Sequence, residues 1–181
     1  EKNKIFWDIG SNIGLYSIYA SRTKLSETYS FEPSMLNLEN LIKNINLNKL
    51  EKKIKIIPFP ITNFTGFNDF LLSNDELGGA LSNYGESLDS DIKISNNLSY
   101  KIFGLSGDEC IKKLNFKNPD YIKIDVDGIE NLILEGLTNN INFAKSLLVE
   151  IDKSKQIQSN EIKTFLENKG FKLDNSFFET K

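Results

Sequence analysis

Three carboxylate side chains gather in one short stretch of the sequence, Asp125, Asp127 and Glu130. They follow the apolar run 121–124, which is typical of a buried strand. Carboxylates at a strand end can orient a substrate hydroxyl, accept its proton, or bind a divalent cation. Asp127 and Glu130 also have a purely structural interpretation, because acidic residues favour the first turn of a helix. The chain contains no His, so a general base must be a carboxylate, Lys, Tyr or Cys.

A second group of residues is Asp8, Gly10, Asn12 and Gly14. It starts at the end of an expected strand, 4–9, and runs into the beginning of an expected helix, 13–20. Glycines in such a loop let a ligand approach the backbone, and the following helix presents free N–H groups. The third glycine of the dinucleotide motif G-x-G-x-x-G is missing. Asp8 would repel a pyrophosphate but can hold an ammonium group. The loop therefore favours a zwitterionic or nucleoside ligand, or it is a tight turn without a ligand.

The carboxylate of Glu32 stands at the end of the next expected strand, 28–31. It lies 22 residues after Gly10, close to the spacing of about 20 at which a carboxylate of the second strand binds ribose hydroxyls. The purely structural alternative is that Glu32 is a surface residue before Pro33. We favour the ribose role because Glu32 occurs at this spacing together with the glycine loop.

Strands and helices are expected to alternate along nearly the whole chain. Further strands are predicted at 54–60, 99–105, 121–125, 146–151 and 171–173, with an extra strand at 67–72. Further helices are predicted at 34–47, 107–114, 130–137 and 160–169, the last capped by Asn160. This alternation predicts a three-layer α/β fold with a mostly parallel sheet. Ligands of such sheets bind beyond the carboxyl ends of the strands, where this chain places Asp8, Glu32, Asn63, Asp125 and Glu150. The irregular stretch 73–97 is expected to be a binding loop or a mobile segment.

Composition narrows the classes of function. At 181 residues with a net charge of −3, the chain suits one domain and has no basic field that would indicate a nucleic-acid partner. Its single cysteine excludes an internal disulfide framework. No apolar run approaches the roughly 18 residues of a membrane span, and no signal peptide is visible, so we expect a cytoplasmic protein. Because the sequence starts almost directly on the first strand, we expect residues 1–181 to be a single domain excised from a longer chain.

The motifs and their order resemble those of the FkbM-type family of S-adenosylmethionine-dependent methyltransferases. The matching segments are 6–17, 31–33 with 44–48, 61–63 with 65–66, 122–130 and 148–151. The resemblance implies a Rossmann-like class I methyltransferase fold and S-adenosylmethionine as the cofactor. It further implies an oxygen acceptor on a sugar, glycan or other small molecule.

The resemblance also implies a role for each matching residue. Asp8, Gly10 and Asn12 would frame the methionine part of the cofactor, and Gly14 would allow close helix approach. Glu32 would bind the ribose hydroxyls, and Asn63, which stands where the family often has Asp, would lie next to the adenine. Asp125 would face the methyl-transfer centre, and Asp127 replaces the family's more usual Glu. The candidate bases are Asp125, Asp127 and Glu130.

Two other classes of function stay open at this point. A metal-dependent glycosyltransferase would use Asp125-Val126-Asp127 as a D-x-D metal motif, although the Asp8–Gly14 loop and Glu32 argue against it. A methyltransferase-like domain could instead serve as a non-catalytic binding module of a longer protein. A DNA or RNA amino-methyltransferase is disfavoured, because the strand end at Asp125 lacks the Asn/Asp-Pro-Pro-aromatic motif. A divalent metal ion is possible but no metal ligand is predicted, and the sequence does not predict the oligomeric state.

Overall fold

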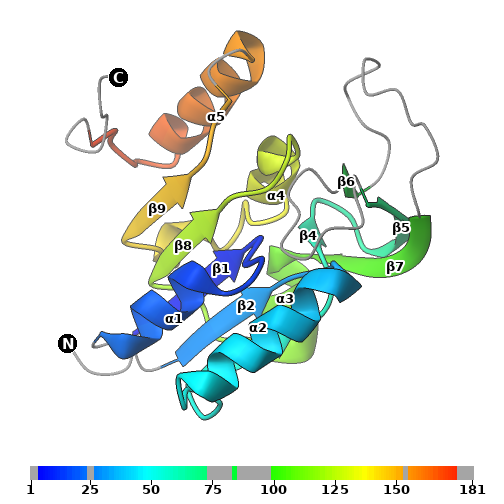
Figure 1. Ribbon diagram of the computed structural model, residues 1–181. Helices are drawn as coiled ribbons and strands as arrows, with labels where there is room; N and C mark the ends of the chain where they lie inside the picture. The colour runs from blue at the N-terminus through cyan, green and yellow to red at the C-terminus, as the bar shows by residue number, and fades with distance from the viewer. Residues whose placement is uncertain (1–3, 24–26, 73–82, 85–98, 153–154, 175–181) are drawn as a thin grey trace.

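The computed structural model describes residues 4–23, 27–72, 83–84, 99–152 and 155–174 (Figure 1). Its elements follow one another in the order β1 (Ile5–Ile9), α1 (Leu15–Arg22), β2 (Glu27–Phe31), α2 (Met35–Leu47), β3 (Ile54–Ile57), β4 (Ile61–Thr62), β5 (Gly66–Leu71), β6 (Asn83–Tyr84), β7 (Ser99–Ser106), α3 (Gly107–Leu114), β8 (Tyr121–Ile124), α4 (Glu130–Glu135), the 3₁₀ turn η1 (Ile141–Phe143), β9 (Ser146–Val149) and α5 (Gln156–Asn168).

The central sheet has five parallel strands in the order β3-β2-β1-β8-β9. The chain moves outward from β1 through β2 to β3, and later returns to the other side of β1 with β8 and β9. The strand order therefore reverses between β1 and β8. Open α/β sheets bind ligands at such a reversal, beyond the carboxyl ends of the strands.

Helices cover both faces of this sheet, which confirms the predicted three-layer α/β architecture (Figure 1). On one face, Leu41 and Ile45 of α2 pack with Ile54 of β3 and Ile18 of α1. On the other face, α3, α4 and α5 pack on β1, β2 and β8 in the larger core. The central sheet therefore has a helix layer on each of its faces, as is usual for parallel sheets.

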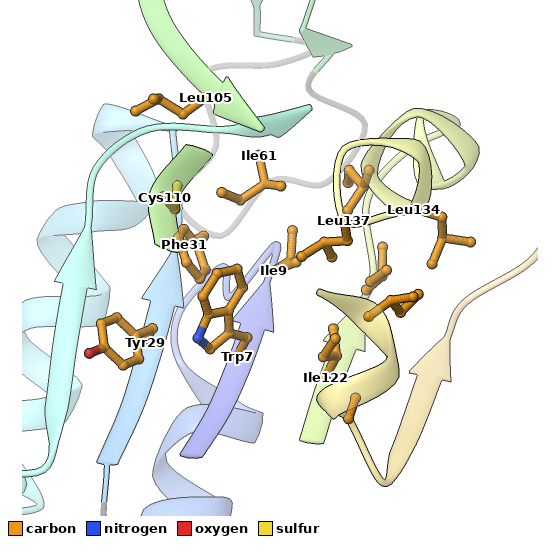
Figure 2. Close-up of a cluster of buried hydrophobic side chains, with 14 of the residues drawn as sticks. Trp7, Ile9, Tyr29, Phe31, Ile61, Leu105, Cys110, Ile122, Leu134 and Leu137 are labelled. Atoms are coloured by element: carbon orange, nitrogen blue, oxygen red, sulfur yellow. The ribbon is translucent and has the colours of Figure 1, made fainter. Parts of the chain in front are cut away.

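The larger core centres on Trp7, whose side chain is fully buried (Figure 2). Its ring centroid lies 5.1 Å from that of Phe31 and 6.1 Å from that of Tyr29, both on the neighbouring strand β2. Gly107 begins α3, and a Cβ there would lie 2.3 Å from Leu137 and 3.4 Å from the ring of Trp7. The absence of a side chain at Gly107 thus lets α3 pack closely on the core beneath the strand ends.

A smaller sheet, in the order β4-β7-β5-β6, extends beside the carboxyl end of the central sheet (Figure 1). The extra strand predicted at 67–72 is β5, which pairs antiparallel with β7. Phe70 of β5 is buried and packs against Tyr100 of β7, with ring centroids 5.4 Å apart. Most of the stretch 73–97, predicted as a binding loop or mobile segment, lies outside the described residues.

Two elements near the carboxyl terminus differ from the predictions. Helix α5 begins at Gln156, so Asn160 lies within the helix and does not cap it. Residues 171–173 form no strand in the part of the chain that the structure describes. Their side chains Lys172 and Leu173 are exposed, so the apolar pattern there did not reflect a place in the sheet. Within the described ranges, no helix is both long and apolar enough to cross a bilayer.

Candidate functional site

A cavity of about 450 Å³ opens at the reversal of strand order, beyond the carboxyl ends of β1, β2, β8 and β9. Its apolar wall is formed mainly by Phe31, Pro60, Ile61, Phe70 and Ile129, and its polar residues are Ser11, Asn12, Glu32, Asn37, Lys123, Asp125, Asp127 and Glu150. Of the residues predicted at the site, the cavity brings together Gly10, Asn12, Glu32, Asp125 and Asp127.

The loop between β1 and α1 is held close to the neighbouring strand ends. The N–H groups of Gly10 and Ser11 both donate to the carbonyl oxygen of Phe31, over 3.1 and 3.0 Å. Gly10 has a φ of +77°, and a Cβ there would lie 1.9 Å from the carbonyl oxygen of Asp125. Only glycine combines this backbone conformation with so close an approach. Gly14, at φ +92°, lets the start of α1 approach Leu41 of α2 in the same way.

The carboxylate of Glu32 is buried at the floor of the cavity and holds two backbone N–H groups. Its Oε2 accepts from Asn12 N over 2.7 Å, and its Oε1 accepts from Ser34 N over 2.9 Å. Burial raises the pKa of Glu32, although these hydrogen bonds favour its ionised form. Asn37 Nδ2 adds a third, longer hydrogen bond of 3.5 Å to Oε1. A carboxylate has about four acceptor positions, so Oε2 of Glu32 keeps a position for a ligand hydroxyl while the side chain ties the glycine loop to α2.

Asp8 lies beneath the cavity and is not part of its lining. Its side chain is fully buried and accepts a hydrogen bond of 2.6 Å from Ser17 of α1. Burial raises the pKa of Asp8, and the neighbouring cation of Lys123, 3.4 Å from its Oδ1, opposes that rise. We expected Asp8 to meet the ammonium group of a ligand, whereas in the structure Lys123 takes that place.

Lys123 is a buried cation that connects three parts of the site. Its Nζ lies 2.8 Å from Asp125 Oδ2, donates to the carbonyl oxygen of Gly10 over 3.0 Å, and stands 4.8 Å from the ring centroid of Tyr16. The side chain of Lys123 is only 5% exposed. A buried charge persists only when it is paired and hydrogen-bonded, and here Asp8 and Asp125 provide the pairing. Lys123 falls within the matching sequence segment 122–130, but the sequence pattern indicated no role for it.

Asp125 and Glu150 form a hydrogen-bonded pair of carboxyl groups on the cavity wall. This hydrogen bond, with burial and the charges of Asp125 and Asp127, raises the pKa of Glu150 to about 7. Burial opposes ionisation of Asp125, but the hydrogen bonds from Glu150 and Lys123 outweigh it and lower the pKa of Asp125. Sequence reasoning placed Glu150 at a strand end and assigned it no role, because only the pairing of β8 with β9 sets it beside Asp125.

Glu130 and Asn63 do not reach the cavity lining. Glu130 accepts from the N–H of Gly128 over 3.2 Å and from Gln158 of α5 over 2.9 Å. It thus fits the helix N-terminal interpretation better than that of a base. Asn63 is exposed and donates to Glu135 over 2.9 Å. Across the described residues, no group of three or more Cys, Asp or Glu side chains has an arrangement that could hold a metal ion.

These residues suit a nucleoside ligand with a positively charged substituent. The buried carboxylate of Glu32 offers an acceptor for a ligand hydroxyl, and the apolar wall around Phe70 and Ile129 can cover a flat ring. The carboxylates of Asp125 and Asp127 lie on the lining with them and favour a cationic centre. S-adenosylmethionine has all three features, so the residues present fit this cofactor.

Comparison with known proteins agrees with this geometry. Residues 8–173 match the family model described as the methyltransferase FkbM domain. Over 151 residues the chain is 27% identical to the hexuronic acid methyltransferase AglP of Haloferax volcanii, covering 83% of this chain and 57% of AglP.

Two solved structures share the fold. The methyltransferase FkbM from Methylobacillus flagellatus has a TM-score of 0.60 at 17% identity, over 91% of this chain and 37% of its own. The protein SMU.1697c from Streptococcus mutans, solved with SAH (S-adenosylhomocysteine), has a TM-score of 0.53 at 9% identity, over 97% and 76% of the two chains. This chain therefore spans little more than half of AglP and a smaller part of the FkbM structure. The family match covers nearly its whole length, and the chain belongs to the FkbM methyltransferase domain family.

Proposed function

We propose that this protein transfers a methyl group from S-adenosylmethionine to an oxygen atom of a sugar or glycan acceptor. The observation that carries the proposal is the buried carboxylate of Glu32, held on the cavity by Asn12 and Ser34 beside the glycine loop. Family membership supports methyl transfer. The name of AglP, which acts on hexuronic acid, supports a sugar acceptor.

Each predicted cofactor contact has a specific part in this proposal. When bound, the cofactor supplies an electrophilic methyl group on a sulfonium. Glu32 would bind the ribose hydroxyls, Gly10 and Asn12 would border the methionine part, and Asp125 would face the methyl group. Asp8 acts indirectly, because it holds Lys123 and through it the loop. We retain Asn63 as a prediction for the adenine contact, although its amide now bonds Glu135.

Positioning supplies much of the rate of such a reaction, because the acceptor oxygen must lie in line with the breaking bond. The loop, Glu32 and the strand-end carboxylates sit on rigid elements around one cavity. A hydroxyl acceptor also needs a group to take its proton. We propose Asp125 and Asp127 among the candidates, since both line the cavity.

Binding of SAH tests the proposal directly. We expect calorimetry to give a dissociation constant on the order of 1–100 µM, or about −5 to −8 kcal/mol. Glu32→Gln removes one ionic hydrogen-bond acceptor and should weaken binding about 10- to 100-fold, in line with about 1.5–3 kcal/mol for such a bond. Glu39→Gln is the matched control, because Glu39 is exposed on α2 and pairs only with Lys43 in the described structure.

A folded sample that does not bind SAH would refute the methyltransferase proposal. Manganese-dependent binding of a nucleotide sugar in its place would support the glycosyltransferase alternative. Binding without transfer to any acceptor would favour a binding module. A screen of hydroxyl and carboxyl groups on hexuronic acids, other sugars and glycans would identify the acceptor. The single-domain assignment of 1–181 and the cytoplasmic location stay predictions from the sequence.

A further inference from the structure

We propose that the carboxylate of Glu150 accepts the proton of the acceptor hydroxyl during methyl transfer, and that Asp125 and Lys123 hold it in position. This inference rests on the methyl-transfer function proposed above. It assigns the base to a residue outside the predicted trio of Asp125, Asp127 and Glu130.

The register of β8 and β9 brings Glu150 to the site. Ile124 pairs with Val149, and the N–H of Glu150 donates to the carbonyl oxygen of Ile124 over 2.9 Å. The residues that follow these strands, Asp125 and Glu150, therefore leave the sheet side by side and share a hydrogen bond. Both line the cavity. Glu150 is the more exposed of the two, so it lies where an acceptor can enter and where its proton can later pass to water.

The contacts of Asp125, Glu130 and Glu32 make each of these three carboxylates a poorer base than Glu150. Lys123, with its Nζ 2.8 Å from Asp125, stabilises the ionised form of Asp125 and makes it a weak proton acceptor. Glu130 bonds Gly128 and Gln158 outside the cavity. Glu32 binds the backbone of the loop. The chain has no His to compete for this role.

The hydrogen bond to Asp125 also suits Glu150 for this chemistry. When Glu150 is protonated it donates to Asp125, and this hydrogen bond, burial and the charges of Asp125 and Asp127 raise the pKa of Glu150 to about 7. Two interacting carboxyl groups lose their protons in separate steps, and the second step is moved upward. A base works best when its pKa is near the pH of the reaction. Glu150 is thus substantially ionised at neutral pH and is a stronger base than an ordinary Glu.

The step balances as follows. A lone pair of the acceptor oxygen forms the new bond to the methyl carbon. The bond between that carbon and sulfur breaks, and its electron pair stays on sulfur as a neutral thioether. The hydroxyl proton moves to the carboxylate of Glu150 and leaves from there to solvent.

Glu150→Gln tests the assignment, because the amide preserves the size of the side chain and can donate to Asp125 but cannot take a proton. In an assay with a hydroxyl acceptor, we expect kcat to fall about 10²- to 10⁴-fold. The affinity for SAH should stay within about threefold of wild type. The control is Glu167→Gln on α5, whose exposed carboxylate pairs with Lys163 and does not line the cavity. This variant should leave kcat unchanged.

A titration of the unliganded protein gives a readout that needs no activity. With ¹³C-labelled glutamate side chains, the resonance absent from Glu150→Gln should titrate with a midpoint near 7 in wild type. In Asp125→Asn the same resonance should titrate at lower pH, because the neighbouring negative charge is gone.

Two results would overturn the inference. One is a Glu150→Gln enzyme that transfers methyl groups to a hydroxyl within threefold of the wild-type rate. The other is a Glu150 resonance that titrates like an ordinary Glu in wild type. Both outcomes leave the proposed function standing if SAH binds. A wild-type protein that fails to bind SAH refutes the proposed function itself, and with it the base role of Glu150.

Discussion

Replacement of Lys123 by Met tests whether one buried cation holds the site together. Met preserves most of the volume of the side chain but removes the charge, so Asp8 and Asp125 lose their common partner. Removing one member of a buried ion pair typically costs about 3–5 kcal/mol, because the remaining charge is buried without compensation.

The surroundings of the two carboxylates place the expected cost in the lower part of that range. Asp8 is fully buried and keeps only the hydrogen bond from Ser17. Asp125 has a side chain that is 38% exposed, so water can solvate much of its charge. We therefore expect Lys123→Met to lower the free energy of unfolding by about 3–4 kcal/mol at pH 8. With a urea m value of about 3 kcal/mol/M, the unfolding midpoint would fall by about 1–1.3 M.

The loss should also depend on pH, with a defined sign. Burial raises the pKa of Asp8 in the folded protein above its unfolded value, so protonation of Asp8 favours the folded state. Without Lys123 the pKa of Asp8 rises further. The difference in stability between wild type and Lys123→Met should therefore narrow as the pH falls from 8 to 5. Urea unfolding followed by the fluorescence of Trp7 measures it at each pH.

A control and a double variant make the result decisive. Lys163→Met removes an exposed cation 3.9 Å from Glu167 and should change stability by less than about 0.5 kcal/mol. In the cycle with Asp8→Asn, the double variant should be more stable than the sum of the single losses by about 1–3 kcal/mol. A Lys123→Met protein within 1 kcal/mol of wild type, or strictly additive single losses, would refute the role of this pair.

Three further predictions concern the glycine loop, the start of β2 and the turn after Glu32. Gly10→Ala should destabilise the protein more than Gly170→Ala in thermal unfolding. Both glycines have a positive φ and share a backbone cost of about 1–2 kcal/mol, but a Cβ at Gly170 meets nothing within 4 Å. Equal losses of stability would contradict the close approach at Gly10. Hydrogen bonds from two lysines outweigh burial and lower the pKa of Glu27 to about 2. Glu27→Gln should therefore cost about 1 kcal/mol at pH 7, and this loss should shrink in acid unfolding as the pH falls from the unfolded pKa toward the folded one. A loss as large at pH 2 as at pH 7 would contradict this prediction. Tyr100 donates to the carbonyl oxygen of Pro33 over 2.6 Å. Tyr100→Phe removes this hydrogen bond and should weaken SAH binding about three- to tenfold in calorimetry. Unchanged affinity would show that the turn after Glu32 keeps its position without this hydrogen bond.

The alternation of strands and helices could be predicted because the residues of each element indicate that element locally. The apolar run 5–9, the glycine loop and the helix start after Glu32 all agree with the structure, and Ser34 caps α2 by accepting from Asn37 N. Local patterns of this kind reflect periodicity, capping and turn chemistry, which do not need distant partners. The helix that begins at Gln156 was misplaced by four residues because Asn160 is a good cap in isolation.

The sequence by itself determined the α/β class, the glycine loop and the carboxylate of Glu32, since these depend on residue types at short spacing. Only the tertiary structure decided what the strand-end carboxylates meet. Pairing of β1 with β8 places Lys123 beside Asp8, and pairing of β8 with β9 places Glu150 beside Asp125. Which face a side chain takes depends on strand register and on packing between segments far apart in the chain. For that reason Glu130 and Asn63, well placed in sequence, lie outside the cavity, whereas Lys123 and Glu150 line it.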